Sequence, residues 1–164
     1  MTAQVLHGRA IHPGVAEGPA LVSTQGIALC AGTDPYTGII TERKHQLRGE
    51  NIRGTVLVFP YGKGSSAFTK FAYGLWLAGN APAAWIVRDV NPQTALASLV
   101  LRIPAITDLD SDPITAIKTG DWIRVDGNRG EVVIVSHALQ QRGSGSGLAS
   151  RQDPSSGAMA GGTD

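Results

Sequence analysis

The chain has 164 residues, of which 42% are hydrophobic, and its 14 Lys and Arg against 13 Asp and Glu give a formal net charge of +1. This length suits one domain with a real core, and the balanced charge argues against a nucleic-acid or anionic-membrane partner. The single cysteine, Cys30, excludes an internal disulfide framework and cannot alone build a zinc or iron–sulfur site. No run approaches the ~20 apolar residues of a membrane span, and residues 1–8 lack the features of a secretion signal, so we expect a cytoplasmic protein.

The first part of the chain is expected to form a hairpin of two short strands within residues 5–22, joined by a glycine-rich turn. Residues 26–38 then pass from an apolar start into a cluster of turn formers, in which Asp34-Pro35 predicts a tight loop. Asp34 either accepts backbone N–H bonds within that loop or faces a substrate. We interpret Cys30 as a buried, inert thiol.

A polar stretch follows a third short apolar run. Residues 39–41 are expected to pair as a strand, and residues 42–49 are expected to be exposed. His45 lies in the polar stretch. It is either a solvated surface group or, because the next strand begins soon after it, a residue that borders a cleft.

The central feature is a short apolar strand, 56–59, followed by a glycine-rich turn, 60–66, and a helix beginning near Ala67. This arrangement leaves backbone N–H groups at the helix start pointing at one small volume, where an anion can sit. The alternative is that a serine simply caps the helix. The spacing matches neither a Walker A loop nor a dinucleotide fingerprint.

The turn supplies glycines that permit close approach, two hydroxyls at the helix mouth and one positive charge. Its candidate site residues are Gly62, Lys63, Gly64, Ser65 and Ser66.

The rest of the chain alternates strands and helices. An apolar stripe predicts a helix ending at Gly79-Asn80, and we further expect a strand at 83–87, a helix from Asn91-Pro92 to Leu99 or Leu101, a strand at 102–106 and a hairpin at 117–135. The result is a three-layered α/β domain of mixed sheet, in which the Gly-Ser turn lies at a strand's carboxyl end. We assign residues 1–138 to this domain and expect the Gly/Ser-rich tail, 139–164, to be flexible.

Four motifs occur in order along the chain: Asp34-Pro35-x-Thr37-Gly38-x-Ile40, His45-x-Leu47-x-Gly49, Gly54-x-Val56-Leu57-x-x-Pro60-x-Gly62-x-Gly64-Ser65-Ser66 and Gly79-x-Ala81-Pro82-Ala83-Ala84. With these motifs the chain resembles the small subunit, or C-terminal swivelling domain, of the aconitase X family. The resemblance implies a swivelling β/β/α fold that works beside a large subunit carrying an iron–sulfur cluster. It also implies dehydration of a small hydroxy acid, either cis-3-hydroxy-L-proline, which we favour, or mevalonate 5-phosphate.

The Gly-Ser turn also looks like its counterpart in ordinary aconitases. That likeness implies that Ser65 is the general base that removes a proton next to a carboxylate and that Ser66 hydrogen-bonds the substrate. Ordinary aconitases place an arginine after the serine pair, and Ala67 stands there in this chain, so a tricarboxylate substrate is not expected. We assign substrate binding to Ser66, Gly64, Lys63, Gly62, Asp34 and His45.

The resemblance implies that this chain binds no cofactor itself and that the iron of the large subunit acts on the departing hydroxyl. A second interpretation is a non-catalytic swivelling or carrier domain, since 103–106 and 120–132 are similar to the phosphohistidine swivelling domain of phosphoenolpyruvate-using enzymes. Serines stand where that family needs its histidine, so phosphotransfer through histidine is not expected. A third interpretation is a free-standing assembly module, and copurification with a larger, iron-containing partner would distinguish it from the enzyme.

Overall fold

The computed structural model describes residues 3–135, and the predicted tail lies outside them. The strands are β1 (Gln4–His7), β2 (Arg9–His12), β3 (Val15–Val22), β4 (Ile27–Ala28), β5 (Val56–Phe59), β6 (Gly62–Lys63), β7 (Ala84–Val87), β8 (Ala105–Thr107), β9 (Trp122–Asp126) and β10 (Glu131–Val135). The helices are α1 (Ala67–Leu77), α2 (Pro92–Leu101) and α3 (Pro113–Ala116).

Eight strands form one sheet in the order β1-β10-β9-β3-β5-β7-β8-β2, and β4 pairs with β6 in a separate pair. Strand β3 joins two halves of the large sheet. Its first part, Val15 to Pro19, runs antiparallel to β9, and its last part, Ala20 to Val22, runs parallel to β5. The half beyond β3 is parallel through β5, β7 and β8.

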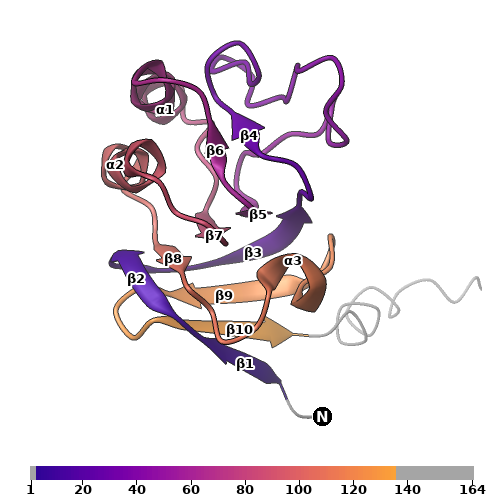
Figure 1. Ribbon diagram of the computed structural model, residues 1–164, viewed down its shortest axis with the longest axis vertical. Coiled ribbons are helices and arrows are strands. Elements are labelled where there is room, and N and C mark those ends of the chain that lie inside the picture. Colours follow the sequence, from indigo (N-terminus) through magenta and orange to yellow (C-terminus); the bar gives the residue numbers. More distant parts are fainter. Residues whose placement is uncertain (1–2, 136–164) are drawn as a thin grey trace, which may run out of the picture.

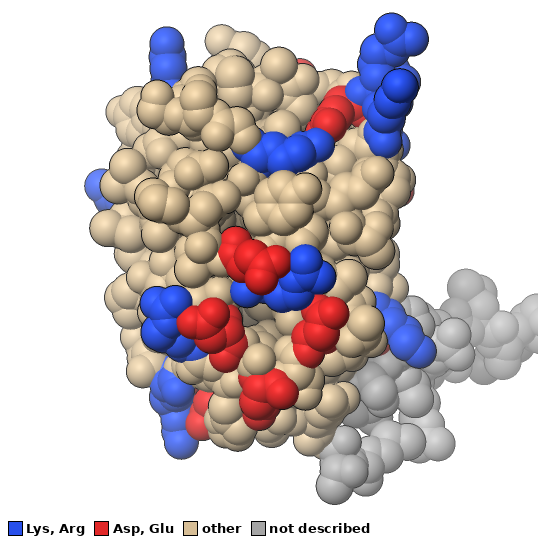
Figure 2. Space-filling view, in the orientation of Figure 1, with Lys and Arg blue, Asp and Glu red and all other residues tan. Residues whose placement is uncertain are grey.

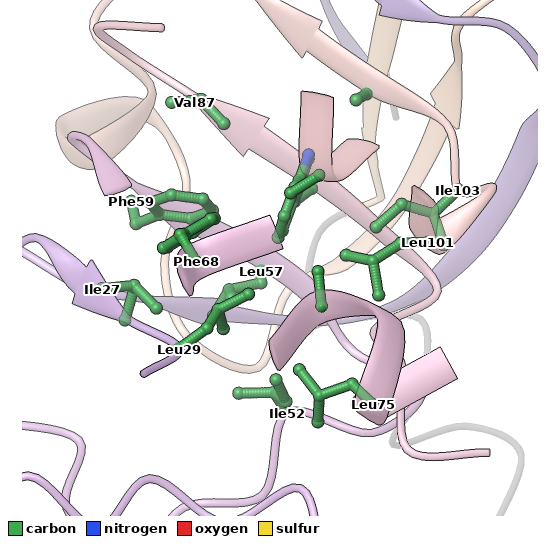
Figure 3. Packing of buried hydrophobic residues seen from close by; sticks show 14 of the residues in the cluster. Ile27, Leu29, Ile52, Leu57, Phe59, Phe68, Leu75, Val87, Leu101 and Ile103 are labelled. Atoms are coloured by element: carbon green, nitrogen blue, oxygen red, sulfur yellow. The ribbon is translucent and has the colours of Figure 1, made fainter. Parts of the chain in front are cut away.

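The molecule has three layers (Figure 1), with α1 and α2 on one face of β5 and β7 and the β1-β10-β9 half of the sheet on the other. Side chains of β5 alternate between two cores. Leu57 and Phe59 join the core under the helices (Figure 3), whereas Val56 and Val58 join the core between the two sheet halves. Because both faces are covered, these strands are apolar throughout. The predicted three-layered α/β fold with a mixed sheet is confirmed.

Helix α1 begins and ends where the sequence predicts. At its end Gly79 has φ +72°, its N–H donates to the Trp76 carbonyl at 3.1 Å, and the N–H of Asn80 donates to the Leu75 carbonyl at 2.9 Å. These two bonds form a Schellman motif, which satisfies carbonyls that the helix leaves free. Helix α2 begins at Pro92 with Asn91 as its N-cap, as predicted.

The expected pairing of the first strands is wrong. Strand β1 pairs with β10, β2 pairs with β8, and β3 pairs with β5 and β9, so no hairpin forms among them. The strands exist, but most of their partners lie about a hundred residues away, where burial in the shared cores decides the pairing. The expected hairpin at the other end forms between β9 and β10.

Residues 39–41 do not form a strand. They make only isolated bridges, Thr33 to Ile40 and Ile39 to Asn51, within a long loop. The polar stretch after them is also less exposed than expected, because His45 and Leu47 are buried. Leu47 joins the core under the helices, and its burial turns this loop inward.

Charged side chains of both signs are interspersed on the face in Figure 2, and neither sign forms a continuous patch there. Among the described helices, none has the length and apolarity needed to cross a membrane.

Candidate functional site

The Gly-Ser turn lies between the carboxyl end of β5 and the first turn of α1 (Figure 1). Within it, β6 runs parallel to β4, with Gly62 opposite Ile27 and Lys63 opposite Ala28. Gly64, Ser65 and Ser66 then lead into the helix and are all exposed. The structure therefore places the turn at the carboxyl end of β5, where the sequence predicts it.

Both serine hydroxyls are accessible. Ser66 is the N-cap of α1, but its side chain makes no capping hydrogen bond. The Ser65 hydroxyl accepts a long bond of 3.4 Å from the N–H of Ala67, and the Ser65 carbonyl accepts the N–H of Phe68 at 2.9 Å. The simple capping alternative therefore accounts for little of this serine pair.

The two glycines of the turn are needed for different reasons. A Cβ on Gly62 would collide with the hydroxyl of Thr94 on α2, so the residue is small because the turn packs against that helix. Gly64 meets nothing within 4 Å, but its φ of +119° lies in a region that residues with a side chain rarely adopt. The small size of Gly62 therefore allows the turn to pack closely against α2, and the positive φ of Gly64 sets the direction in which the chain continues into the serine pair.

Lys63 is paired with a residue that no sequence motif singles out. Its Nζ lies 2.5 Å from Oε1 of Glu42, and the two side chains are 33% and 31% exposed. Glu42 is held in place by its own backbone, because the N–H groups of Thr41 and Glu42 both donate to the Gly32 carbonyl. The ammonium is therefore fixed beside the turn while remaining open to solvent.

A hollow of about 330 Å³ lies between the first turns of α1 and α2. It is lined by Ser66 and Thr69 from the α1 side and by Pro92, Gln93 and Leu96 from α2. We call it the α1–α2 hollow. It gives Ser66 an open, largely apolar neighbourhood.

Asp34 lies at the other end of α1. Its carboxylate accepts the N–H of Tyr36 and the hydroxyl of Thr37, both at 2.9 Å, so it closes its own loop, as the first of its two alternatives predicts. The next residue, Pro35, packs against Gly74, which is eight residues beyond Ser66 and therefore about 12 Å along the helix. The structure does not bring Asp34 to the Gly-Ser turn.

His45 is 5% exposed and lies under its loop. Its Nδ1 accepts the N–H of Leu47 at 3.1 Å, which assigns the proton to Nε2, 3.3 Å from the hydroxyl of Ser23. Ser23 in turn donates to the Gln25 carbonyl at 2.6 Å. These contacts tie the His45 loop to the segment after β3, and the burial of His45 contradicts the interpretation as a solvated surface group.

Cys30 is partly buried and is a free thiol, so it is more accessible than expected. Across residues 3–135, no three His, Cys, Asp or Glu side chains come together closely enough to hold a metal ion.

Two further residues reach the turn from the neighbouring connection. The amide of Asn91 donates to the Gly62 carbonyl at 2.8 Å, and the amide of Gln93 donates to the Gly64 carbonyl at 3.2 Å. Asn91 carries a sequence signal only as a helix cap, and neither Gln93 nor Glu42 carries any. Their roles depend on contacts 21 to 29 residues away along the chain, which no local pattern reports.

The model of the aconitase X swivel domain matches residues 5–134 of this chain. A phosphomevalonate dehydratase small subunit from Methanocella arvoryzae is 42% identical, over 76% of this chain and 95% of the relative. One from Pyrococcus furiosus is 41% identical, over 80% of this chain and 96% of the relative. The crystal structure of Thermococcus kodakaraensis aconitase X in its holo-form superposes with a TM-score of 0.77 at 38% identity, covering 81% of this chain and 99% of that one.

The fold and the site thus define a class of protein: a three-layered swivelling domain with a Gly-Ser turn at the carboxyl end of a central strand. The chain belongs to the aconitase X swivel-domain family. It is the small component of an aconitase X-type dehydratase, a hydro-lyase built from two kinds of subunit.

Proposed function

We propose that this chain supplies the serine base of a heteromeric dehydratase whose substrate is mevalonate 5-phosphate. The observation that carries the proposal is the exposed Ser65-Ser66 pair at the start of α1, preceded by Gly64 at φ +119° and by Lys63, whose ammonium pairs with Glu42. The substrate follows the names of the relatives described above rather than the hydroxyproline that the resemblance first favoured.

The chemistry assigned to this chain is removal of one proton. In mevalonate 5-phosphate, the carbon next to the carboxylate loses its proton to the Ser65 oxygen. The electron pair of that C–H bond becomes the new double bond, while the neighbouring carbon loses hydroxide. The proton taken up by Ser65 and this hydroxide together make up the one water that is released, so the serine oxygen is free for the next turnover. A serine hydroxyl is too weak an acid to act as alkoxide unaided, so it needs nearby positive charge. The helix start and Lys63 supply that charge in our proposal.

The remaining groups bind the substrate. Ser66 lines the α1–α2 hollow and is placed to donate a hydrogen bond to the substrate. Lys63 is placed to attract a carboxylate or a phosphate of the substrate. We assign the iron–sulfur cluster to the large subunit. We also propose that Asp34 and His45 maintain the loops around the site and do not contact the substrate.

The test is turnover by the complex reconstituted from this chain and its large subunit, with mevalonate 5-phosphate and cis-3-hydroxy-L-proline offered separately. Ser65→Ala should lower kcat by roughly 10²- to 10⁴-fold while the complex still assembles. Ser111→Ala is the matched control, because Ser111 is also exposed and also lies just before a helix, α3. If the Ser65→Ala complex is as active as the Ser111→Ala complex, Ser65 is not part of the mechanism. If the complex turns over cis-3-hydroxy-L-proline and not mevalonate 5-phosphate, the proposed substrate is wrong.

A further inference from the structure

The connection from β5 to α1 does not stand alone at the carboxyl ends of the central strands. The connection from β7 to α2 runs beside it in the same direction. The N–H of Arg88 donates to the Phe59 carbonyl at 3.1 Å, and the N–H of Asp89 donates to the Pro60 carbonyl at 2.8 Å. Backbone bonds therefore join the two connections where they leave their strands.

Side chains continue this alignment once the backbones separate. Asn91 donates from Nδ2 to the Gly62 carbonyl, and Gln93 donates from Nε2 to the Gly64 carbonyl. These carbonyls belong to the residues on either side of Lys63. The Gly64 carbonyl is also part of the peptide bond that leads to Ser65, so its orientation sets the direction in which Ser65 leaves the turn.

Asn91 is itself held firmly. Its Oδ1 accepts the N–H of Thr94 at 3.0 Å and the hydroxyl of Thr94 at 2.6 Å. The amide oxygen of Asn91 thus caps α2 while its amide nitrogen donates to the turn, and the side chain is partly buried. Gln93 has a second connection to the site, because it lines the α1–α2 hollow together with Ser66.

The end of the turn has few other contacts. Gly64 is exposed with nothing near its missing Cβ, and the Ser66 side chain makes no cap bond. The hydroxyl of Ser65 has one long bond to its own helix start. The amide of Gln93 therefore holds the residue immediately before the serine pair, and the amide of Asn91 holds the turn two residues earlier.

We propose that Asn91 and Gln93 are positioning residues for Ser65, acting by holding the carbonyls of Gly62 and Gly64. This inference rests on the proposed function, since it assigns a purpose to the position of the Ser65 oxygen. A general base must lie within hydrogen-bonding reach of the proton it removes, and a displacement of about 1 Å can cost on the order of 10²-fold in rate. Loss of either amide loosens the turn, and neither amide is among the groups to which the proposed function assigns substrate binding.

The experiment uses the reconstituted complex and the variants Asn91→Ser and Gln93→Met. Serine at position 91 keeps an oxygen that can cap α2 but loses the donor to Gly62. Methionine at 93 keeps the length of the side chain and loses the donor to Gly64. We expect kcat to fall by about 10- to 100-fold in each variant, with KM for mevalonate 5-phosphate changed less than about threefold.

Asn51→Ser is the matched control. Asn51 also donates from Nδ2 to a backbone carbonyl, that of Thr37 at 2.9 Å, and also accepts a nearby N–H, that of Arg53 at 2.9 Å, but it lies in the loop after Asp34. Its kcat should stay within about twofold of the parent protein. Amide hydrogen exchange at residues 64–66 should be faster in Asn91→Ser and Gln93→Met and unchanged in Asn51→Ser.

A parent-like kcat in both turn variants would overturn the inference, as would equal losses in kcat for the Asn51→Ser control. If both turn variants fail to assemble with the large subunit, Asn91 and Gln93 have a structural role, and the inference is overturned as well. The failure of the proposed function looks different. If Ser65→Ala abolishes turnover while Asn91→Ser and Gln93→Met do not affect it, only the positioning role is lost, whereas an active Ser65→Ala complex removes the catalytic serine itself.

Discussion

Gly64→Ala is the change that most directly tests whether the backbone of the Gly-Ser turn matters. A side chain at φ +119° is strained, and such strain costs on the order of 1–3 kcal/mol. No steric term adds to it, because nothing lies within 4 Å of the new Cβ. Alanine also restricts the unfolded chain, which offsets about 0.4–1 kcal/mol. The expected net loss in the free energy of unfolding is therefore about 1–2 kcal/mol.

For a domain of this size, each kcal/mol lowers Tm by about 4 °C, so thermal unfolding of the chain should show a decrease of about 4–8 °C. Gly49→Ala provides the control, because Gly49 has φ +90°, also meets nothing within 4 Å and lies outside the turn. Both variants should lose similar stability. In the reconstituted complex only Gly64→Ala should lower kcat, by at least about tenfold, since the strain is relieved by moving the backbone before Ser65.

Two results would refute this reasoning. If Gly64→Ala keeps the Tm of the parent protein, the backbone at this position accepts a side chain and the positive φ does not constrain the turn. If its Tm falls while kcat remains that of the Gly49→Ala complex, the conformation is required for folding alone, and the direction of the turn does not position Ser65.

Two further predictions concern the charge beside the turn and the core beneath it. Lys63→Met should raise KM for mevalonate 5-phosphate by at least about tenfold in steady-state kinetics, because an anionic substrate loses a nearby cation. Its Tm should change little, since the pair with Glu42 is one-third exposed and such pairs contribute about 0–1 kcal/mol; an unchanged KM would contradict the role. Trp85→Phe should cost about 1–3 kcal/mol by urea unfolding, because the indole donates to the buried Ser98 hydroxyl at 2.8 Å. Adding Ser98→Ala should recover part of that loss, and no recovery would contradict the account.

The strand, turn and helix around the candidate site follow from the sequence because each depends on neighbours along the chain. The apolar run of β5 needs cover on both faces, the glycines allow the chain to turn, and an apolar stripe directs α1 onto the sheet. The capping of α2 by Asn91 is equally local. The features that could not be predicted are those that need a distant partner, such as the burial of His45 against Ser23.

The sequence by itself determined most of the elements, their layering and the place of the serine pair at the start of a helix, because short-range periodicity and turn chemistry specify them. Only the tertiary structure decided that β3 is shared by the two halves of the sheet, that Glu42 holds Lys63 and that α2 holds the turn through Asn91 and Gln93. The physical reason is that strand pairing and side-chain hydrogen bonding depend on competition among all strands and loops for the same buried surface and the same backbone carbonyls. That competition is settled only when the whole chain has folded.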